Sequence, residues 1–250
     1  YVQKNKNEFY HIAQEKEQEL AEKKFKEIQE KYKSKLSENT ELKYIIKKGK
    51  IYSEVVNQAH SFNESFIVSS THGASGFEKF FLGSNTFKII TATTRPVFTI
   101  RDSISPKNIS NIILPLDSSH DTRQKVPFTA EIASYCNAKI HVVSVCQTLN
   151  KELEKKLKGY TKQTCEYLDK QNIPYETDLR SGKNITDLTL EYAQEVSADL
   201  ISIMTEQSVA FSGVVIGGNA QEILNRSDFP VLSNTPKELS IKGGFRTQGY

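Results

Sequence analysis

The sequence predicts an α/β protein composed of two tandem modules, each built on a parallel, doubly wound sheet. Two observations support this prediction. In the second half of the chain, short apolar strands alternate with helices, which is typical of crossover connections in a parallel sheet covered on both faces. Several short patterns also recur 134 residues apart, which indicates that the chain carries two copies of one unit.

The repeat keeps the same separation at three points. The matching stretches are Phe66–Val68 with Leu200–Ser202, Gly83–Asn85 with Gly217–Asn219, and Arg95–Val97 with Phe229–Val231. At this separation the first strand of the second module, near residue 112, has no counterpart, because its position falls before residue 1. We therefore expect the first module to lack its opening strand, helix and strand. Either the sequence is a piece of a longer chain or the module borrows strands from a partner, and we favour the first explanation.

Residues 8–37 carry the longest helical pattern in the chain. Apolar residues recur at helical intervals, and Glu and Lys fill the other positions, where they can pair four residues apart. A coiled-coil or partner-binding arm would show this pattern too. A solvated helix with one buried stripe is commoner, and we expect that arrangement.

The rest of the first module alternates short strands with helices. The apolar runs SFIVSS and PVFTI predict two buried strands, separated by a loop rich in Gly and Ser. In chain order we expect a strand over 42–46, a turn at Gly49, a helix over 51–60, a strand over 65–70, a helix beginning near Ser84 and a strand over 96–100.

The second module shows the alternation throughout, with five strands, as in an ordinary doubly wound domain. We expect strands over 111–116, 139–146, 175–179, 199–204 and 230–232, and helices over 122–136, 151–171, 185–196 and 220–225, with a loop before the last helix. The domains are therefore a first module over 1–102, a second module over 107–236 and a polar tail over 237–250.

Composition excludes several classes of protein. The 33 Lys and Arg residues nearly balance 30 Asp and Glu residues, so the chain lacks the broad basic face of a nucleic-acid-binding protein. Three cysteines without metal-ligand spacing argue against a disulfide framework or a zinc site. No apolar run approaches the roughly 20 residues that span a bilayer, and no signal peptide is evident, so we expect a cytoplasmic protein without a membrane segment.

The loop between the two strands of the first module carries the strongest functional signal. Gly73 follows a strand directly, where it allows a close approach of the backbone. Gly83 and Ser84 open a helix, whose unpaired N–H groups and dipole favour an anion. A tight turn followed by an ordinary helix cap accounts for the same residues equally well.

The segment from Ser70 to Asn85 resembles the signature of the universal stress protein family, Gly-x2-Gly-x9-Gly-Ser/Thr. The resemblance implies a sheet of the adenine nucleotide alpha hydrolase type, a dimer or pseudo-dimer, a role in the stress response and, in many members, bound ATP. It implies that Asp117, which ends the first strand of the second module, contacts adenine and that the backbone of Val145 meets the base. The residues implied to hold nucleotide phosphate in the first module are His72, Gly73, Gly83, Ser84 and Asn85.

The sequence departs from this signature in both modules. Ser70 replaces the first glycine, and the separation of 134 places Met204 and Gln207 where the second module should carry its first two glycines. A side chain at 207 would intrude on a triphosphate or require a positive φ. The first module therefore has a phosphate loop but lacks its base-reading strand. The second module has the base-reading strand but lacks an intact phosphate loop.

The sequence does not predict an enzyme. His72 has no nucleophile or orienting carboxylate arranged around it, and the remaining histidines, His11, His60, His120 and His141, have no pairing pattern and suit surface or cap positions. We expect a non-enzymatic regulatory protein, at most weakly turning over ATP. Its expected partners are its own two modules as a pseudo-dimer, a second copy and an unidentified protein. The alternative is a nucleotide-free scaffold that uses the fold for dimerisation.

Overall fold

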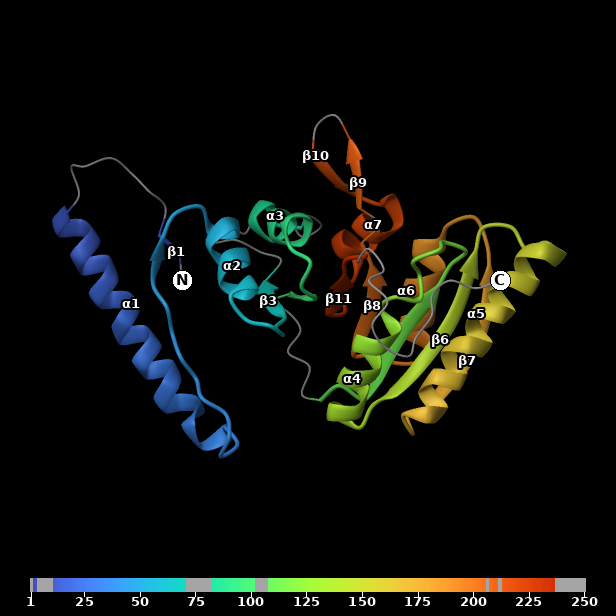
Figure 1. The fold of residues 1–250 in the computed structure, drawn as a ribbon, viewed down its shortest axis with the longest axis horizontal. Coiled ribbons are helices and arrows are strands. Elements are labelled where there is room, and N and C mark those ends of the chain that lie inside the picture. Colours follow the sequence, from blue (N-terminus) through green and yellow to red (C-terminus); the bar gives the residue numbers. More distant parts are fainter. Residues whose placement is uncertain are drawn as a thin grey trace. The chain divides into compact units, whose positions relative to one another are not determined.

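The computed structural model describes residues 2–3, 11–70, 82–101, 108–205, 207–210 and 213–236 (Figure 1). Two compact units divide the chain, Tyr1–Ser61 and Phe62–Tyr250. This division reflects packing and differs from the division into repeated modules. The module boundaries at 1–102 and 107–236 therefore stay a prediction.

The first unit contains two helices and a short pair of strands. Helix α1 (His11–Tyr32) continues as a 3-10 turn (Lys33–Lys35). Strand β1 (Val2–Gln3) pairs in parallel with β2 (Lys47–Lys48). Helix α2 spans Ile51–His60. The expected helix over 8–37 thus ends its α-helical part at Tyr32, whereas the helix over 51–60 is confirmed.

The strand expected over 42–46 is wrong, because the strand in this stretch consists of Lys47–Lys48, which pair with Val2–Gln3. The segment before β2 is tied to α1 instead. The Gln29 side-chain amide donates to the Leu42 carbonyl at 2.6 Å, and the Phe25 and Tyr44 rings stack at 5.2 Å. The turn at Gly49 is confirmed, since its φ of +151° suits glycine and a Cβ there would lie 2.7 Å from Glu54 Oε1.

The second unit is built on one seven-stranded sheet with the order β3-β4-β11-β8-β5-β6-β7. All neighbouring strands are parallel except β4 and β11, which are antiparallel. This confirms the predicted α/β class with parallel sheets. The strands are β3 (Ile67–Ser70), β4 (Val97–Ile100), β5 (Asn111–Leu116), β6 (Lys139–Cys146), β7 (Tyr175–Ser181), β8 (Leu200–Met204) and β11 (Val231–Asn234).

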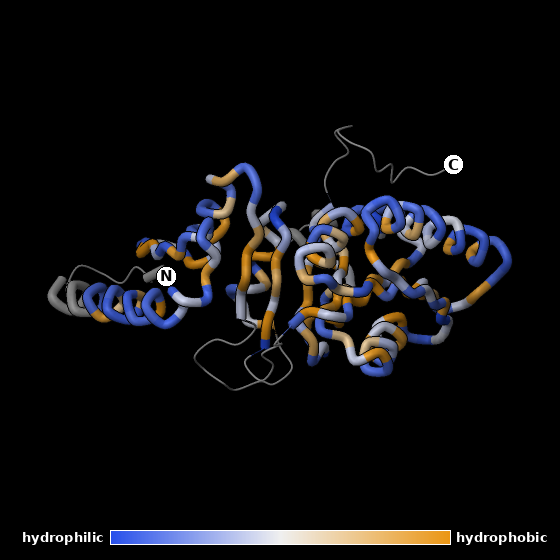
Figure 2. Tube along the Cα trace, turned by 90° about the horizontal axis from the view of Figure 1, so that it is seen from below, coloured by the Kyte–Doolittle hydropathy of each residue, from blue (hydrophilic) through white to orange (hydrophobic). Residues whose placement is uncertain are grey.

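Five helices accompany the sheet: α3 (Ser84–Ala92), α4 (Val126–Cys136), α5 (Lys151–Lys170), α6 (Ile185–Glu195) and α7 (Gly218–Arg226). Apolar side chains of the central strands, α4 and α5 form one buried cluster, and in Figure 2 the hydrophobic residues follow the strands. Helix α4 begins at Val126 and not at Thr122 as expected. Pro127 has no N–H group to pair and is favoured in a first helical turn, while Gln124 N–H still bonds Asp121 O in a preceding turn.

The loop expected before α7 contains a strand pair that the sequence analysis missed. Strand β9 (Gln207–Ala210) pairs antiparallel with β10 (Gly213–Ile216), and Gln207 lies opposite Ile216. The stretch that corresponds to the phosphate loop of the first module is therefore hydrogen-bonded backbone in the second.

The two modules repeat each other closely in local structure. Helices α3 and α7 begin 134 residues apart, as do α2 and α6. Gly83 before α3 has φ −54° and ψ 141°, and Gly217 before α7 has φ −53° and ψ 144°. The same separation relates a hydrogen bond after each helix, from Arg95 N–H to Thr93 Oγ1 and from Phe229 N–H to Ser227 Oγ, both at 3.0 Å.

The repeated modules meet at the antiparallel pair of β4 and β11. Phe98 lies opposite Leu232, and these residues are themselves separated by 134 positions. A pair of equivalent residues facing each other across antiparallel strands is the arrangement that a two-fold axis produces. Thr99 Oγ1 donates across this junction to Val231 O at 3.2 Å, and Thr235 Oγ1 donates to Thr93 O at 3.1 Å. The sheet thus has the form of an intramolecular pseudo-dimer.

Candidate functional site

The first candidate site lies where β3 leads to α3. Gly83 is the N-cap of α3, and Ser84 and Asn85 occupy its first turn with exposed side chains. Among the described residues, no side chain caps this end, and the first turn carries no acidic residue. The dipole and the amides of this turn therefore favour an anion, and no carboxylate of the turn opposes one. His72 and Gly73 lie outside the described residues.

Thr86 fixes this helix end to the strand. Its hydroxyl donates to Ser70 O at 2.7 Å and shares a 2.9 Å hydrogen bond with Ser69 Oγ, and the side chain is buried. The second module adds a further contact, because Leu82 N–H donates to Asn225 Oδ1 on α7 at 3.0 Å. Gly83 is thus held from both modules.

The second candidate site is a small pocket at the carboxyl ends of β5, β6 and β8. It contains Asp117 and Val145, the two residues that the sequence analysis assigned to base recognition. They come together because neighbouring parallel strands end at the same edge of a sheet, where the strand order reverses between β5 and β8. The other lining residues are Pro115, Lys125, Ile185, Thr189, Ile203, Met204, Asn219, Ala220 and Ile223.

Polar groups are already engaged around Asp117. Asp117 Oδ1 accepts from Ser119 N–H at 2.8 Å, and Asp117 N–H donates to Thr122 Oγ1 at 3.1 Å. The ammonium group of Lys125 donates to Thr122 O at 2.8 Å, and this side chain is 2% exposed. A buried amine therefore sits at the wall of the pocket, held by the turn that precedes α4.

The pocket has a volume of about 40 Å³. One water molecule takes up roughly 30 Å³ of liquid, and pockets for small molecules measure roughly 300–1,000 Å³. As it stands, the pocket has room for water but not for a nucleobase. Met204, which occupies the position of the first signature glycine, lines it.

The structure does not bring the two candidate sites together. Gly83, Ser84 and Asn85 follow β3 in the first module, whereas Asp117 and Val145 follow β5 and β6 in the second. Three strands, β4, β11 and β8, separate β3 from β5. Each site therefore belongs to its own module, as the sequence analysis expected.

Sequence reasoning missed Lys125 and Asn219 in the second pocket. Asn219 had a signal, since it corresponds to Asn85 at the 134-residue separation. Lys125 had none, because its place depends on the turn over 121–125 that delays the start of α4. The same stretch buries Arg123, which lies 3.9 Å from the Tyr160 ring centroid and donates to Gln163 Oε1. Burial lowers the pKa of Arg123 from its ordinary value, and Tyr160 opposes that shift.

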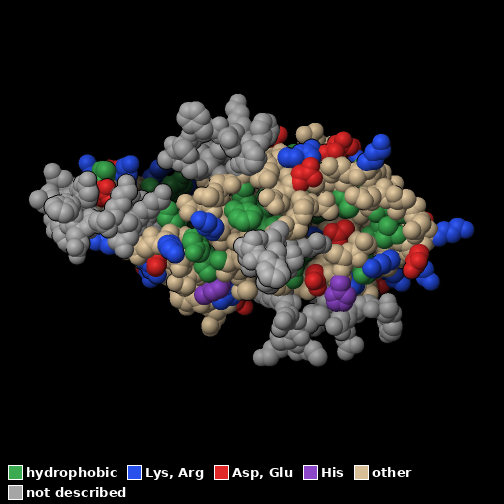
Figure 3. Space-filling view, turned by 90° about the horizontal axis from the view of Figure 1, so that it is seen from above, with side chains coloured by type: hydrophobic (Ala, Val, Ile, Leu, Met, Phe, Trp, Pro, Cys, Tyr) green, Lys and Arg blue, Asp and Glu red, His purple; other side chains and the backbone are tan. Residues whose placement is uncertain are grey.

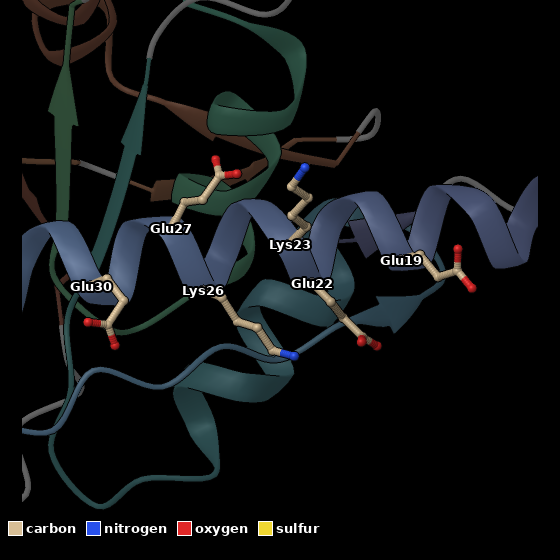
Figure 4. Close-up of a pocket in the computed structure, with 6 residues that line it drawn as sticks. All are labelled: Glu19, Glu22, Lys23, Lys26, Glu27 and Glu30. Carbon is tan, nitrogen blue, oxygen red and sulfur yellow. The ribbon is translucent and has the colours of Figure 1, made fainter.

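A larger hollow of about 510 Å³ lies along α1 in the first unit (Figure 4). Its lining residues all come from one helix: Glu19, Glu22, Lys23, Lys26, Glu27 and Glu30. Acidic and basic side chains are both present along the helix and point in different directions. A surface formed by a single solvated helix encloses nothing, so it is not a binding cleft.

The surface and the ionisable groups offer no competing site in the described part of the chain. On the face seen in Figure 3, basic and acidic side chains are interspersed. Among the described residues, no group of three or more His, Cys, Asp or Glu side chains is placed to hold a metal ion. No described helix is long and apolar enough to cross a bilayer.

Comparison with known proteins identifies the family. A profile of the universal stress protein family matches residues 4–101 and again residues 108–233. The chain belongs to the universal stress protein family. The two matches confirm the tandem form, because each covers one of the repeated modules. No curated protein is similar enough in sequence to count as a relative.

Solved structures share the fold of this universal stress protein. A universal stress protein from Archaeoglobus fulgidus has a TM-score of 0.73 at 17% identity, with 94% of this chain and 85% of that chain covered. A functionally unknown protein from Pseudomonas aeruginosa has a TM-score of 0.60 at 17% identity, with 94% and 81% covered. At these identities the similarity concerns the fold.

Proposed function

We propose that this universal stress protein is a non-enzymatic, cytoplasmic regulatory protein of the stress response that binds ATP through its first module. The observation that supports the proposal most directly is the uncapped first turn of α3 at Gly83–Asn85, which carries no acidic residue. An anion at this turn would receive backbone N–H groups and the Ser84 hydroxyl.

The residues proposed to hold phosphate are His72, Gly73, Gly83, Ser84 and Asn85. Binding would draw the loop between Gly73 and Gly83 against the end of β3 and so change the surface offered to a protein partner. We assign Asp117 and Val145 of the second module to base recognition only as a secondary proposal, because their pocket holds about 40 Å³.

Regulation rather than catalysis is favoured by the chemistry of the described residues. Asp117 is hydrogen-bonded within its own turn, and the polar groups near it are Thr122 and Lys125, which do not form a nucleophile with a base and an orienting group. We infer that ATP serves as a signal, with at most slow turnover.

Calorimetry with ATP tests the proposal on three proteins: the unaltered chain, Gly83→Val and Gly217→Val. Both glycines have nearly the same φ and ψ, which any residue can adopt, so neither change strains the backbone. We expect Gly83→Val to weaken ATP binding at least about tenfold, since a branched side chain would stand beside the amides of α3. The matched change Gly217→Val should leave binding unaltered.

Equal binding by all three proteins, or by none, contradicts the proposal. Loss of binding in Gly217→Val alone would move the site to the second module. A mass spectrum of the small molecules that co-purify with the protein provides an independent measurement.

A nucleotide-free scaffold is the second candidate, and specific observations favour it. The second-module pocket is too small for a nucleobase, and the hairpin of β9 and β10 occupies the stretch of the phosphate loop. The β4–β11 junction pairs the two modules through their own strands. Calorimetry that detects no ATP binding in any of the three proteins, with no co-purified nucleotide, would support this candidate.

A further inference from the structure

The backbone that leads into α3 is bonded to the opposite module through one residue, Asn225. Leu82, which precedes the N-cap Gly83, donates its N–H to Asn225 Oδ1 at 3.0 Å. Since a backbone N–H can only donate, the side-chain oxygen of Asn225 is the group that faces Leu82. Asn225 lies in the last turn of α7, which belongs to the second module. A helix of one module therefore fixes the entrance to the anion-binding turn of the other.

The backbone of Asn225 is held from the first module as well. The last carbonyl groups of a helix have no partner within that helix. The carbonyl oxygen of Asn225 accepts from the guanidinium group of Arg101, which follows β4. Asn225 is thus bonded to the first module at two points, its side chain at Leu82 and its backbone at Arg101. Because both groups bond the same residue, this arrangement also places a positive charge close to the entrance of α3.

The equivalent contacts in the pseudo-dimer differ at the side chain. At the 134-residue separation, Arg101 corresponds to Thr235, and Thr235 Oγ1 also donates to a carbonyl after the opposite helix, that of Thr93. Asn225 corresponds to Thr91, but the hydroxyl of Thr91 donates to carbonyl groups of its own helix, α3. The backbone contacts therefore follow the two-fold relation, whereas the side-chain contact of Asn225 does not.

The stretch that Asn225 holds in the first module has another support in the second. Leu82 corresponds to Ile216, which ends β10 and lies opposite Gln207 in the hairpin. The second module thus fixes this stretch through its own strand pairing. The first module receives a side chain from its neighbour at the same point.

We propose that Asn225 is a positioning residue for the anion-binding turn at residues 83–85, so that the second module contributes to the ligand affinity of the first. The inference rests on the proposed function and deepens it. The hydrogen bond from Leu82 orients residue 82, and the next peptide group carries the N–H of Gly83, at the start of the turn that would face a phosphate. Without Asn225, ligand binding would have to order residue 82, and this ordering costs affinity.

Calorimetry with ATP on the whole chain measures this cost. Asn225→Leu keeps a side chain of similar size and removes the acceptor for Leu82. We expect ATP binding to weaken about 5- to 30-fold, which corresponds to ordering the backbone of one residue. The matched control is Thr91→Val at the equivalent position of α3. It removes a hydroxyl that bonds only its own helix carbonyls among the described residues, so ATP affinity should not change.

Amide exchange distinguishes a positioning role from a general loss of stability. In Asn225→Leu, the N–H of Leu82 should exchange at least about tenfold faster, whereas the N–H of Leu232 in β11 should change little. Asn225→Asp retains an oxygen that can accept from Leu82, so the exchange of Leu82 should stay slow in this variant.

The same aspartate variant provides a second readout. Its negative charge opposes an anion, and salt screens that charge. At high salt its ATP affinity should therefore approach that of the unaltered chain measured at the same salt. The affinity of Asn225→Leu should stay low.

The results separate this inference from the proposed function. If Gly83→Val weakens ATP binding and Asn225→Leu does not, the proposed function stands and the positioning role of Asn225 is refuted. If the unaltered chain binds no ATP, the proposed function fails, and pyrophosphate then probes the same turn without a base. Weaker pyrophosphate binding by Asn225→Leu supports the inference, and equal binding or none overturns it. Unchanged exchange of the Leu82 N–H in Asn225→Leu overturns it as well.

Discussion

His141 shows how a residue's strand position overrides its polar character. The sequence analysis expected a surface or cap role, but the side chain is buried on β6 at 4% exposure. This expectation is wrong because β6 is an interior strand, and every residue after Lys139 in it is buried. His141 Nε2 lies 3.1 Å from Asn111 Oδ1, and the ring meets Tyr192 edge-on. Burial lowers the pKa of His141 from its ordinary value, the Glu176 carboxylate at 3.6 Å opposes this shift, and Lys139 adds to it.

Because the pKa of His141 is lowered in the folded protein, we expect the free energy of unfolding to decrease as the pH is lowered. As the pH drops below about 6.5, the unfolded chain takes up a proton at this residue before the folded protein does, so the free energy of unfolding decreases. Urea denaturation between about pH 5 and 7.5 measures this slope. His141→Gln should flatten this slope.

The titration of Glu176 does not interfere with the measurement of this pH dependence. Its hydrogen bond to Lys139 lowers the pKa of the Glu176 carboxyl, so its contribution to stability is lost only at lower pH. A slope that persists in His141→Gln above about pH 5 would show that another group is responsible.

At the scale of the secondary-structure elements, the packing of the strands depends on the junction between β4 and β11. Phe98 and Leu232 belong to one buried cluster and lie opposite each other in the pairing. Leu232 is 0% exposed and Phe98 is 9% exposed. The cluster therefore runs across the boundary between the modules, and the junction is part of the core.

Shortening the side chains that meet at the β4–β11 junction should destabilise the whole second unit. Leu232→Ala should lower the free energy of unfolding by about 2–5 kcal/mol, because it leaves a cavity in the core. Phe98→Ala should act in the same direction. The double variant should show a coupling of about 0.5–3 kcal/mol, as neighbouring residues do. Val68→Ala, at the exposed edge, should change stability by less than about 0.5 kcal/mol, and additive effects of the junction pair would contradict the packing described.

The sequence predicted best the elements whose pattern is set by burial on both faces. Strands β5 and β6 agree with the prediction at both ends, since continuous apolar runs between turn residues leave little choice. The hairpin of β9 and β10 escaped prediction because its pairing involves only its own two strands, which form a separate two-stranded sheet. The strand expected over 42–46 failed because contacts of Gln29 and Tyr44 with neighbouring segments decide its conformation.

In the candidate site, too, some features could be predicted from the sequence and others could not. Asp117 and Val145 were named from the resemblance to the family, and they lie in one pocket because neighbouring parallel strands end at one edge of a sheet. The presence of Lys125 in the wall of their pocket could not be predicted, because its burial accompanies the side-chain hydrogen bonds of one turn.

For the molecule as a whole, the packing units and the repeated modules do not coincide. Strands β3 and β4 belong to the first module by sequence, yet they lie in the same sheet as the second module and in the unit Phe62–Tyr250. A cut at the module boundary would therefore expose the edge of β11, including the backbone next to Leu232. The antiparallel partner of β11 in the intact chain is its own equivalent, β4.

This arrangement predicts that a fragment of residues 107–236 forms a dimer through β11. Two copies of β11 can pair antiparallel with Leu232 opposite Leu232, because the β4–β11 junction already has this two-fold geometry. Light scattering should give twice the fragment's mass, and Leu232→Lys should return it to a monomer. The longer fragment 62–236 retains β4 on that edge and serves as the matched control, so it should not associate through β11. If both fragments associate and Leu232→Lys does not change that association, another surface is responsible and the junction is not self-complementary.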